Sequence, residues 1–185
     1  MRGSLLALAL VLGCGRSAVP PALSDLSGRS VSSPSQLGWV SSAGPSGDLP
    51  SAIALGGKAS GRALVYLEFP PESEPRRLLR AELLLGTLPG GADAIEIELS
   101  RAEPPSGKLR GWSDQPRARY PRLSTQLASN QAQLRVDVTE LVRAQNKPDE
   151  PLRLLLRAEP GAGAPVLLQT GAAGGVAPRL EQYWE

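Results

Sequence analysis

The stretch from residue 112 to residue 120 gathers side chains of the kinds that recognise sugars. It reads Trp-Ser-Asp-Gln-Pro-Arg-Ala-Arg-Tyr, so two aromatic rings, one carboxylate and two guanidinium groups stand close together. Flat aromatic faces suit pyranose rings, polar side chains suit hydroxyl groups, and arginine suits the carboxylates of acidic sugars. The alternative is that the tryptophan plugs the end of the domain and the arginines are solvated, because large aromatic side chains are mostly buried. The candidate carbohydrate-binding residues of this proline-bounded loop are Trp112, Asp114, Arg117, Arg119 and Tyr120.

Three other places carry side chains that could do chemistry. Glu96 and Glu98 stand two apart on an expected strand, about 7 Å from each other on one face, which would suit paired catalytic carboxylates. A solvated outer face explains this pair as well. Asp137 could help to bind a cation, but capping of a turn or helix is the simpler role. Tyr183 and Trp184 offer a second aromatic ligand surface, and the alternative for them is packing in the core.

Composition excludes several classes of site. The 185 residues include no histidine and one cysteine, so a disulfide framework, a Cys/His zinc site and histidine-based catalysis all lack their residues. Lys and Arg number 20 against 18 Asp and Glu, and the basic residues are scattered, which gives no electrostatic footprint for nucleic acid. We therefore expect no cofactor, no nucleic-acid partner and no enzymatic activity.

After residue 50 the chain alternates apolar and polar residues in short segments that turn residues separate. In the clearest segment, Ile95, Ile97 and Leu99 face one way and two glutamates face the other. Such strands have one buried face and need mutual cover, which predicts an all-β fold, an antiparallel β-sandwich or jelly roll. One helical turn is expected, with Thr139 as its N-cap. The strands, about eight in number, are expected at 51–55, 63–69, 81–85, 94–99, 134–138, 152–156, 165–169 and 179–184.

The N-terminus has the layout of an export signal. Residues 1–13 carry one positive charge at Arg2 and then an apolar run, which is too short to span a bilayer. The sequence Val11-Leu12-Gly13-Cys14 resembles the lipobox of bacterial lipoproteins. That resemblance implies a signal peptide at 1–13 that is removed, and a Cys14 that is lipidated and holds the protein at a membrane. It further implies the cell envelope as location, and the outer membrane if the source is Gram-negative, since residue 15 is glycine and not the aspartate of inner-membrane lipoproteins.

Between Cys14 and the alternating segments the chain is rich in Ser, Gly and Pro. No apolar run there is long enough to bury a face, so residues 14–48 are predicted to be a flexible tether and residues 49–185 the folded domain. Trp39 and Val40 are the large apolar neighbours in the tether. They are expected to dock on the surface of the domain or on a partner.

The order of the segments resembles one known family. Ile53 to Gly57, Ala63 to Phe69, Arg80 to Leu85, the Trp-Ser loop at 112–116, Val136 to Val142, Leu152 to Leu156 and the closing Pro178 to Leu180 follow one another as in the DNRLRE, or disaggregatase-related, domain. That domain is similar to carbohydrate-binding module family 96. The resemblance implies a jelly-roll β-sandwich on an exported, surface-attached protein, with polysaccharide binding in some members.

Three functional classes follow from these patterns. The leading one is a non-catalytic lipoprotein that displays a polysaccharide-binding or adhesive β-sandwich. The second is a structural or assembly subunit that binds another envelope protein. The third is an accessory of an enzyme that degrades envelope polysaccharide.

Overall fold

The computed structural model describes residues 28–44, 47–72, 77–92, 94–129, 133–145, 147 and 149–185. The predicted signal peptide at 1–13, the proposed lipidation site Cys14 and the tether up to residue 27 lie outside these residues. Within them the chain is an antiparallel β-sandwich of the jelly-roll type with one short α-helix. The predicted fold class is therefore confirmed.

All eight predicted strands are present, several of them longer than the apolar pattern indicated. Their inward residues come from the alternation seen in the sequence: Ile97 and Leu99 are fully buried, whereas Glu96 is exposed. The strands are β3 (Ala52–Leu55), β4 (Ala63–Phe69), β5 (Leu78–Leu85), β7 (Ala94–Ala102), β9 (Leu134–Asp137), β10 (Leu152–Ala158), β11 (Val166–Gln169) and β12 (Arg179–Trp184).

Four further strands occur where the sequence pattern predicted none: β1 (Gly28–Ser32), β2 (Gln36–Ser41), β6 (Thr87–Leu88) and β8 (Ala118–Ala128). Two of them correct the predicted tether, because β1 pairs along β12 and β2 pairs along β4. The folded domain therefore includes β1 and β2 and does not begin at residue 49. Residues 33–35 join the edge of one sheet to the edge of another.

Alternation is missing from β2 because its two sides are both covered. Trp39 packs against the main core, whereas Val40 on the opposite side is fully buried in a second cluster. A strand with apolar contacts on both faces has no period of two in its sequence. The expectation that Trp39 and Val40 dock on the domain itself is confirmed, although they do so as part of the sandwich.

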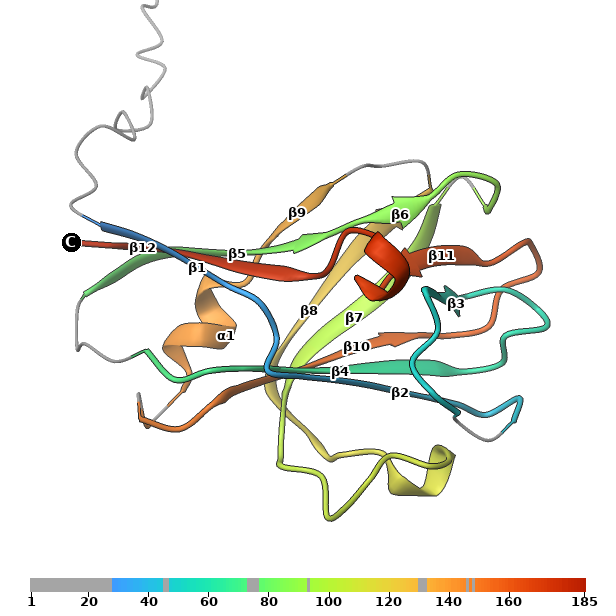
Figure 1. Ribbon diagram of the computed structural model, residues 1–185, viewed down its shortest axis with the longest axis horizontal. Helices are drawn as coiled ribbons and strands as arrows, with labels where there is room; N and C mark the ends of the chain where they lie inside the picture. Colours follow the sequence, from blue (N-terminus) through green and yellow to red (C-terminus); the bar gives the residue numbers. More distant parts are fainter. Residues whose placement is uncertain are drawn as a thin grey trace, which may run out of the picture.

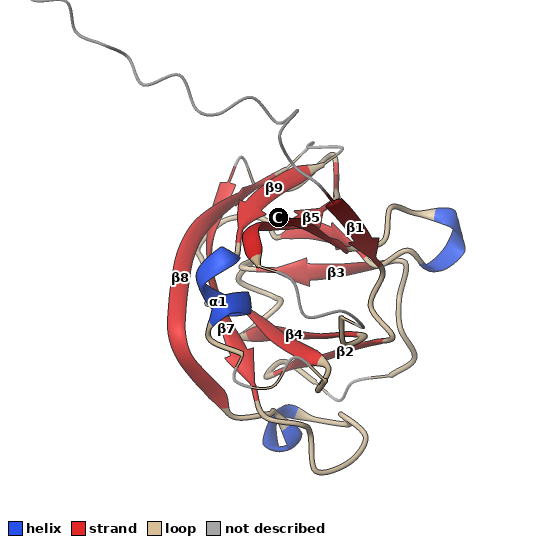
Figure 2. Cartoon of the chain, turned by 90° about the vertical axis from the view of Figure 1, so that its left-hand side faces the viewer, coloured by secondary structure: helices blue, strands red, loops and turns tan. Residues whose placement is uncertain are grey.

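The strands form three antiparallel sheets in two layers (Figure 1). A five-stranded sheet, in the order β2-β4-β10-β7-β8, makes one layer. A four-stranded sheet (β1-β12-β5-β9) and a three-stranded sheet (β3-β11-β6) lie side by side and make the other. Figure 2 shows β8 as a long curved strand along one side of the sandwich.

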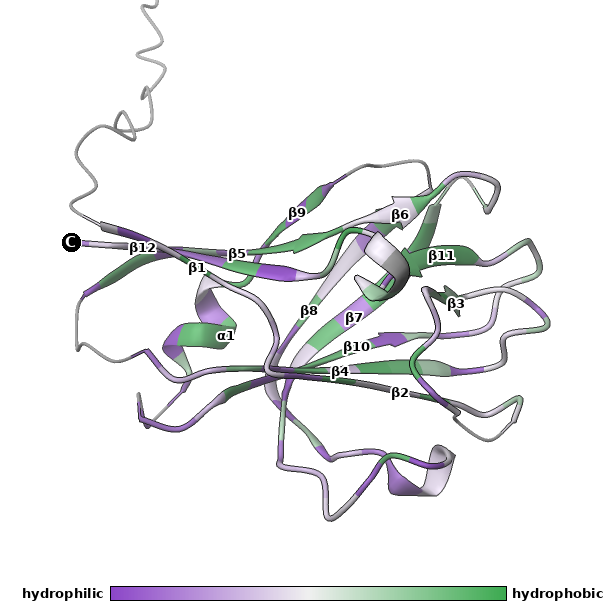
Figure 3. Cartoon of the chain, viewed as in Figure 1, coloured by the Kyte–Doolittle hydropathy of each residue, from purple (hydrophilic) through white to green (hydrophobic). Residues whose placement is uncertain are grey.

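One continuous hydrophobic core fills the space between the layers. Its fully buried residues include Ile53, Val65, Leu83, Leu99 and Leu168, which come from both layers. Each such aliphatic side chain stabilises the fold by roughly 1.5–3 kcal/mol relative to an exposed one. Figure 3 shows polar residues alternating with apolar ones along β7, so that this strand turns one face to the core and the other outward.

The short helix α1 (Thr139–Arg143) is present as predicted, with Leu141 and Val142 buried, but its cap is different. Thr139 is not the N-cap: its hydroxyl accepts the backbone N–H of Ala81 on β5 at 2.9 Å. The carboxylate of Asp137 instead accepts the backbone N–H of Thr139 at 2.9 Å, which confirms the capping role expected for this aspartate. Partial burial opposes its ionisation, but the hydrogen bonds from Thr139 hold the pKa of Asp137 below its usual value.

The outer face of the four-stranded sheet carries a network of ion pairs. Glu181 and Glu82 lie opposite each other on β12 and β5, and their side chains are only 5% and 8% exposed. Arg135 bridges the two carboxylates at 2.9 and 2.7 Å, and Arg29 contacts Glu181 at 2.5 Å. Burial opposes ionisation, but the hydrogen bonds from Arg135, Tyr183 and Arg29 hold the pKa of Glu181 below its usual value.

Candidate functional site

The outer face of the five-stranded sheet is apolar at its centre. Val40, Leu64, Tyr66, Ala102 and Leu155 form a buried cluster there, separate from the main core. Residues 103–117, which connect β7 to β8, lie over this face, below the sandwich in Figure 1. The loop covers the cluster with two half-buried side chains, those of Leu109 and Trp112, and Ala118 at the start of β8 adds a third.

Glycine at position 38 lets the loop approach the sheet. A Cβ atom on Gly38 would lie 2.8 Å from Cδ1 of Leu109, closer than carbon atoms approach one another in proteins. The loop itself is held by Asp114, whose Oδ2 accepts the backbone N–H groups of Arg110 and Gly111, both at 3.1 Å. Asp114 therefore shapes the turn η2 (Trp112–Asp114), a role that the sequence analysis did not give to this candidate ligand.

Where the loop meets the sheet, a depression brings Trp112 and Arg117 together with residues from β8 and β10 and with Arg62, which directly precedes β4. Trp112 does pack against the domain, as the alternative reading expected, but on the outer face of the sheet and not at the end of the sandwich. Its remaining surface lines the depression. We call this depression the arginine groove, and its lining comprises Arg62, Trp112, Gln115, Pro116, Arg117, Ala118, Arg122, Arg157 and Glu159.

The arginine groove carries an excess of positive charge. Among the described residues that line it, four are arginines and one is an acid, Glu159, which pairs with Arg62 at 3.0 Å. Arg122 pairs with Glu98 beside the groove at 3.3 Å. Arg157 donates to the amide oxygen of Gln115 at 3.3 Å, and no carboxylate of the described residues pairs with it or with Arg117. These two guanidinium groups can therefore receive an external anion.

The groove continues along the outward face of β7 and β8. A neighbouring depression shares Arg122, Arg157 and Glu159 with it and adds Glu96, Glu98 and Ser124. The two glutamates thus lie on the outward face, as the sequence predicted. Because Glu98 is engaged by Arg122, a polar face with ion pairs accounts for this pair of carboxylates.

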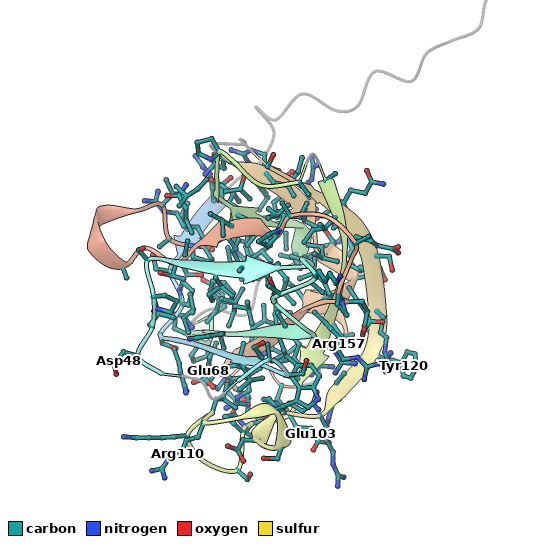
Figure 4. The ribbon with its side chains drawn as sticks, turned by 90° about the vertical axis from the view of Figure 1, so that its right-hand side faces the viewer. Asp48, Glu68, Glu103, Arg110, Tyr120 and Arg157 are labelled. Atoms are coloured by element: carbon teal, nitrogen blue, oxygen red, sulfur yellow. The ribbon has the colours of Figure 1, made fainter. Side chains whose placement is uncertain are left out.

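The structure corrects the prediction that residues 112–120 form one loop. Arg119 and Tyr120 lie on β8, where Arg119 pairs with Arg101 of β7 and Tyr120 falls in a register shift of the ladder, and both lie apart from the loop turn that holds Trp112. Tyr120 is 78% exposed, and the guanidinium of Arg122 stacks over its ring at 5.1 Å from the ring centre. Figure 4 shows Tyr120 and Arg157 on the same side of the molecule. Tyr120 therefore borders the groove through Arg122.

Arg119 points into a different depression. It pairs with Glu103 at 3.0 Å and lies near Arg101, Lys147 and Arg153. Burial and the charge of Arg119 lower the pKa of Arg101. The sequence grouped Arg117 and Arg119 together, but the structure separates them.

The remaining aromatic candidates, Tyr183 and Trp184, make contacts within the fold. Trp184 is 6% exposed and faces inward from β12, which confirms the core packing expected as its alternative. Tyr183 donates its O–H to Glu181 at 2.8 Å. Within the described part of the chain, no group of three or more Asp, Glu, Cys or His side chains could hold a metal ion. No helix in that part is long and apolar enough to cross a membrane.

Sequence reasoning missed three of the four arginines of the groove, Arg62, Arg122 and Arg157. The outward orientation of Arg157 could have been predicted from the alternation of β10. On this strand the outward positions are those of Arg153, Leu155 and Arg157. The register between β10, β7 and β8 then places Arg157 opposite Glu98 and Glu98 opposite Ser124. Arg122, two residues before Ser124 on β8, lines the same depression. Strand pairing over long sequence separations carries this information, and no local motif does.

No model of a known protein family matches the chain, and no curated protein is similar to it. Among solved structures, a family 11 carbohydrate-binding module from Clostridium thermocellum, in complex with a β-1,3-1,4-mixed-linked tetrasaccharide, is similar with a TM-score of 0.37 and 10% sequence identity. The match covers 83% of this chain and 86% of the module. At this similarity the ligand of that module says nothing about the ligand of this chain.

Proposed function

We propose that the β-sandwich is a non-catalytic module that binds an acidic polysaccharide in the arginine groove. The observation that carries the proposal is the meeting of an aromatic side chain, Trp112, with two guanidinium groups that lack carboxylate partners among the described residues. A uronic acid chain presents what these groups bind: ring faces for the indole and carboxylates for Arg117 and Arg157.

The groove suits a polymer better than a small molecule. It is open, and it continues to Ser124 beside Glu96 and Glu98, so that successive sugar units can lie along the sheet with their hydroxyls, not their carboxylates, toward the two glutamates. Gln115 and Ser124 offer hydrogen-bonding groups for hydroxyls. Exposed ion pairs contribute about 0.2–1 kcal/mol each, so the affinity would come from several sugar units bound together.

The proposal places the module on an envelope lipoprotein, anchored through Cys14 as the lipobox resemblance predicts. Acyl chains contribute about 0.8 kcal/mol per buried methylene, which is enough for several chains to hold the protein at a membrane. Cys14→Ser should move the protein from the membrane fraction to the soluble fraction. Membrane retention of this variant would contradict the anchoring.

Affinity electrophoresis tests the proposed ligand class directly. Migration of the Cys14→Ser chain in a native gel should slow when the gel contains polygalacturonate and stay unchanged in a gel that contains a neutral β-glucan. Equal retardation by both polymers would contradict recognition of acidic sugars. No retardation by any tested polysaccharide, together with capture of an envelope protein by the same chain, would favour the assembly subunit instead.

A further inference from the structure

A cavity of about 150 Å³, distinct from the arginine groove, opens at the end of the sandwich beside α1. Figure 2 views the molecule from this end, with α1 between the two layers. The buried residues that line the cavity are Val142, Leu152, Leu180, Gln182 and Trp184, and the more exposed ones include two prolines and Arg143. None of its described lining residues belongs to the arginine groove. A cavity of this volume accommodates one six-membered ring.

Gln182 gives this cavity a polar group in apolar surroundings. It lies on the inward face of β12 between Leu180 and Trp184, which are 2% and 6% exposed, and Gln182 itself is 8% exposed. Among the described residues none makes a hydrogen bond with its side-chain amide. The amide offers two N–H donors and a carbonyl acceptor. Its polar atoms still reach solvent through the cavity, so a ligand that pairs with the amide takes the place of water.

The charged groups around the cavity are already engaged. Arg143 donates to the carbonyls of Leu78 and Leu79 at 3.4 and 3.1 Å and pairs with Glu140 at 3.3 Å. Glu72 accepts a hydrogen bond from the hydroxyl of Ser30 at 3.3 Å. An anion placed beside Gln182 would lack compensation there and would lie near the carboxylate of Glu72, and an uncompensated charge among apolar walls is costly. The cavity therefore disfavours an anionic ligand.

We propose that this cavity binds the acetamido group of an N-acetylated sugar. An acetamido group pairs with Gln182 through two hydrogen bonds: its N–H donates to the glutamine oxygen, and its carbonyl accepts from the glutamine nitrogen. Its methyl group and the apolar face of the sugar ring then pack against Val142, Leu180 and Trp184. The proposal does not depend on the arginine groove, since the two sites share no described lining residue.

Calorimetric titration of the Cys14→Ser chain with N-acetylglucosamine tests the site, with glucose and galacturonate as comparison probes. We expect N-acetylglucosamine to bind at least tenfold more tightly than glucose, and galacturonate to leave this binding unchanged. Equal binding of N-acetylglucosamine and glucose, or no binding of either, would overturn the proposal.

The variant Gln182→Leu distinguishes a ligand-binding role of Gln182 from a purely structural one. The variant should lose the binding of N-acetylglucosamine and, without ligand, keep its melting temperature, because the amide that it removes reaches solvent and makes no hydrogen bond with the described residues. Gln126→Leu makes the same change on the exposed face of β8 and should keep the binding. If a folded Gln182→Leu variant keeps the binding, the site is disproved. Val142→Phe, which fills the cavity from α1, gives an independent loss of binding should Gln182→Leu fail to fold.

Discussion

The guanidinium of Arg157 donates a hydrogen bond to the amide oxygen of Gln115 at 3.3 Å, which joins the outer face of the five-stranded sheet to the loop that carries Trp112. Arg157 is fixed by its strand, and its ladder partners are Leu64 on β4 and Glu98 on β7. The contact therefore holds the part of the groove that the loop supplies against the part that the sheet supplies. Every prediction about the groove depends on this arrangement.

Replacing either unpaired arginine of the groove should weaken binding of an acidic polymer. Arg117→Gln and Arg157→Gln each remove one guanidinium and keep a polar side chain, so we expect about a 3- to 10-fold loss of affinity for each. Arg179→Gln is the matched control, because Arg179 is exposed on β12 in the other layer. Calorimetry with galacturonate oligomers measures all three. An equal loss in the Arg179→Gln variant would show that total charge, not the groove, governs binding.

Salt should weaken this binding. The arginines of the groove are partly exposed, and charges at a surface are screened over about 10 Å at 0.1 M salt and about 3 Å at 1 M. The affinity for polygalacturonate should fall steadily between these two salt concentrations. Binding that does not change with salt would indicate that hydroxyl and ring contacts dominate, and would contradict the role given to Arg117 and Arg157.

The N-terminal strands should be required for the fold. A chain that begins at residue 48 lacks β1 and β2, and with them the fully buried Val40 and the core contacts of Trp39. We expect its free energy of unfolding to fall by at least about 3 kcal/mol relative to a chain that begins at residue 27. Denaturant unfolding followed by tryptophan fluorescence measures the difference. Equal stability of the two chains would restore the tether boundary at residue 48.

Acid should destabilise the sandwich through Glu181 and Asp137. The pKa of each carboxyl is lower in the folded chain than its usual value, so the unfolded chain binds more protons in acid. Their contribution is complete above the unfolded pKa, about 4 for such groups, and is lost as the pH falls through the folded value. Urea unfolding between pH 7 and pH 3 should show a flat stability that declines below about pH 4.5.

Glu181→Gln should identify the source of that decline. The variant removes the charge that pairs with Arg29 and Arg135, and it should cost about 2 kcal/mol at pH 7. Its stability should depend less on pH below pH 4.5 than that of the unmodified chain. Parallel curves for the two chains would show that Glu181 does not contribute to the acid dependence.

Strands with one buried and one solvent-exposed face could be predicted from the sequence, and strands without this pattern could not. The alternation of Ile95, Ile97 and Leu99 identified β7, whereas β2 has Trp39 on one covered side and Val40 on the other, so its pattern looks irregular. β8 alternates weakly because its outward positions, such as Arg122 and Ser124, and several inward ones are polar or half-buried. Its pairing with β7 specifies the strand more than its own residues do.

The candidate site was also predictable only in part, because contacts made in the folded chain decide which residues share it. Trp112 and Arg117 are close in sequence and share the groove, but Arg119, two residues further on, contacts Glu103 in another depression. Asp114 looked like a ligand from its type, whereas the two backbone N–H groups that it accepts are visible only in the folded loop. Arg157 enters the groove through the pairing of β10 with β7, which joins positions far apart in the chain.

The measurement that tests the central claim most directly is the affinity of the Cys14→Ser chain for polygalacturonate with and without the double substitution Arg117→Gln and Arg157→Gln. Calorimetry should show saturable binding for the unsubstituted chain and a loss of at least about tenfold for the double variant, with unchanged thermal unfolding. Unchanged affinity in a folded double variant would contradict the arginine groove as the polysaccharide site.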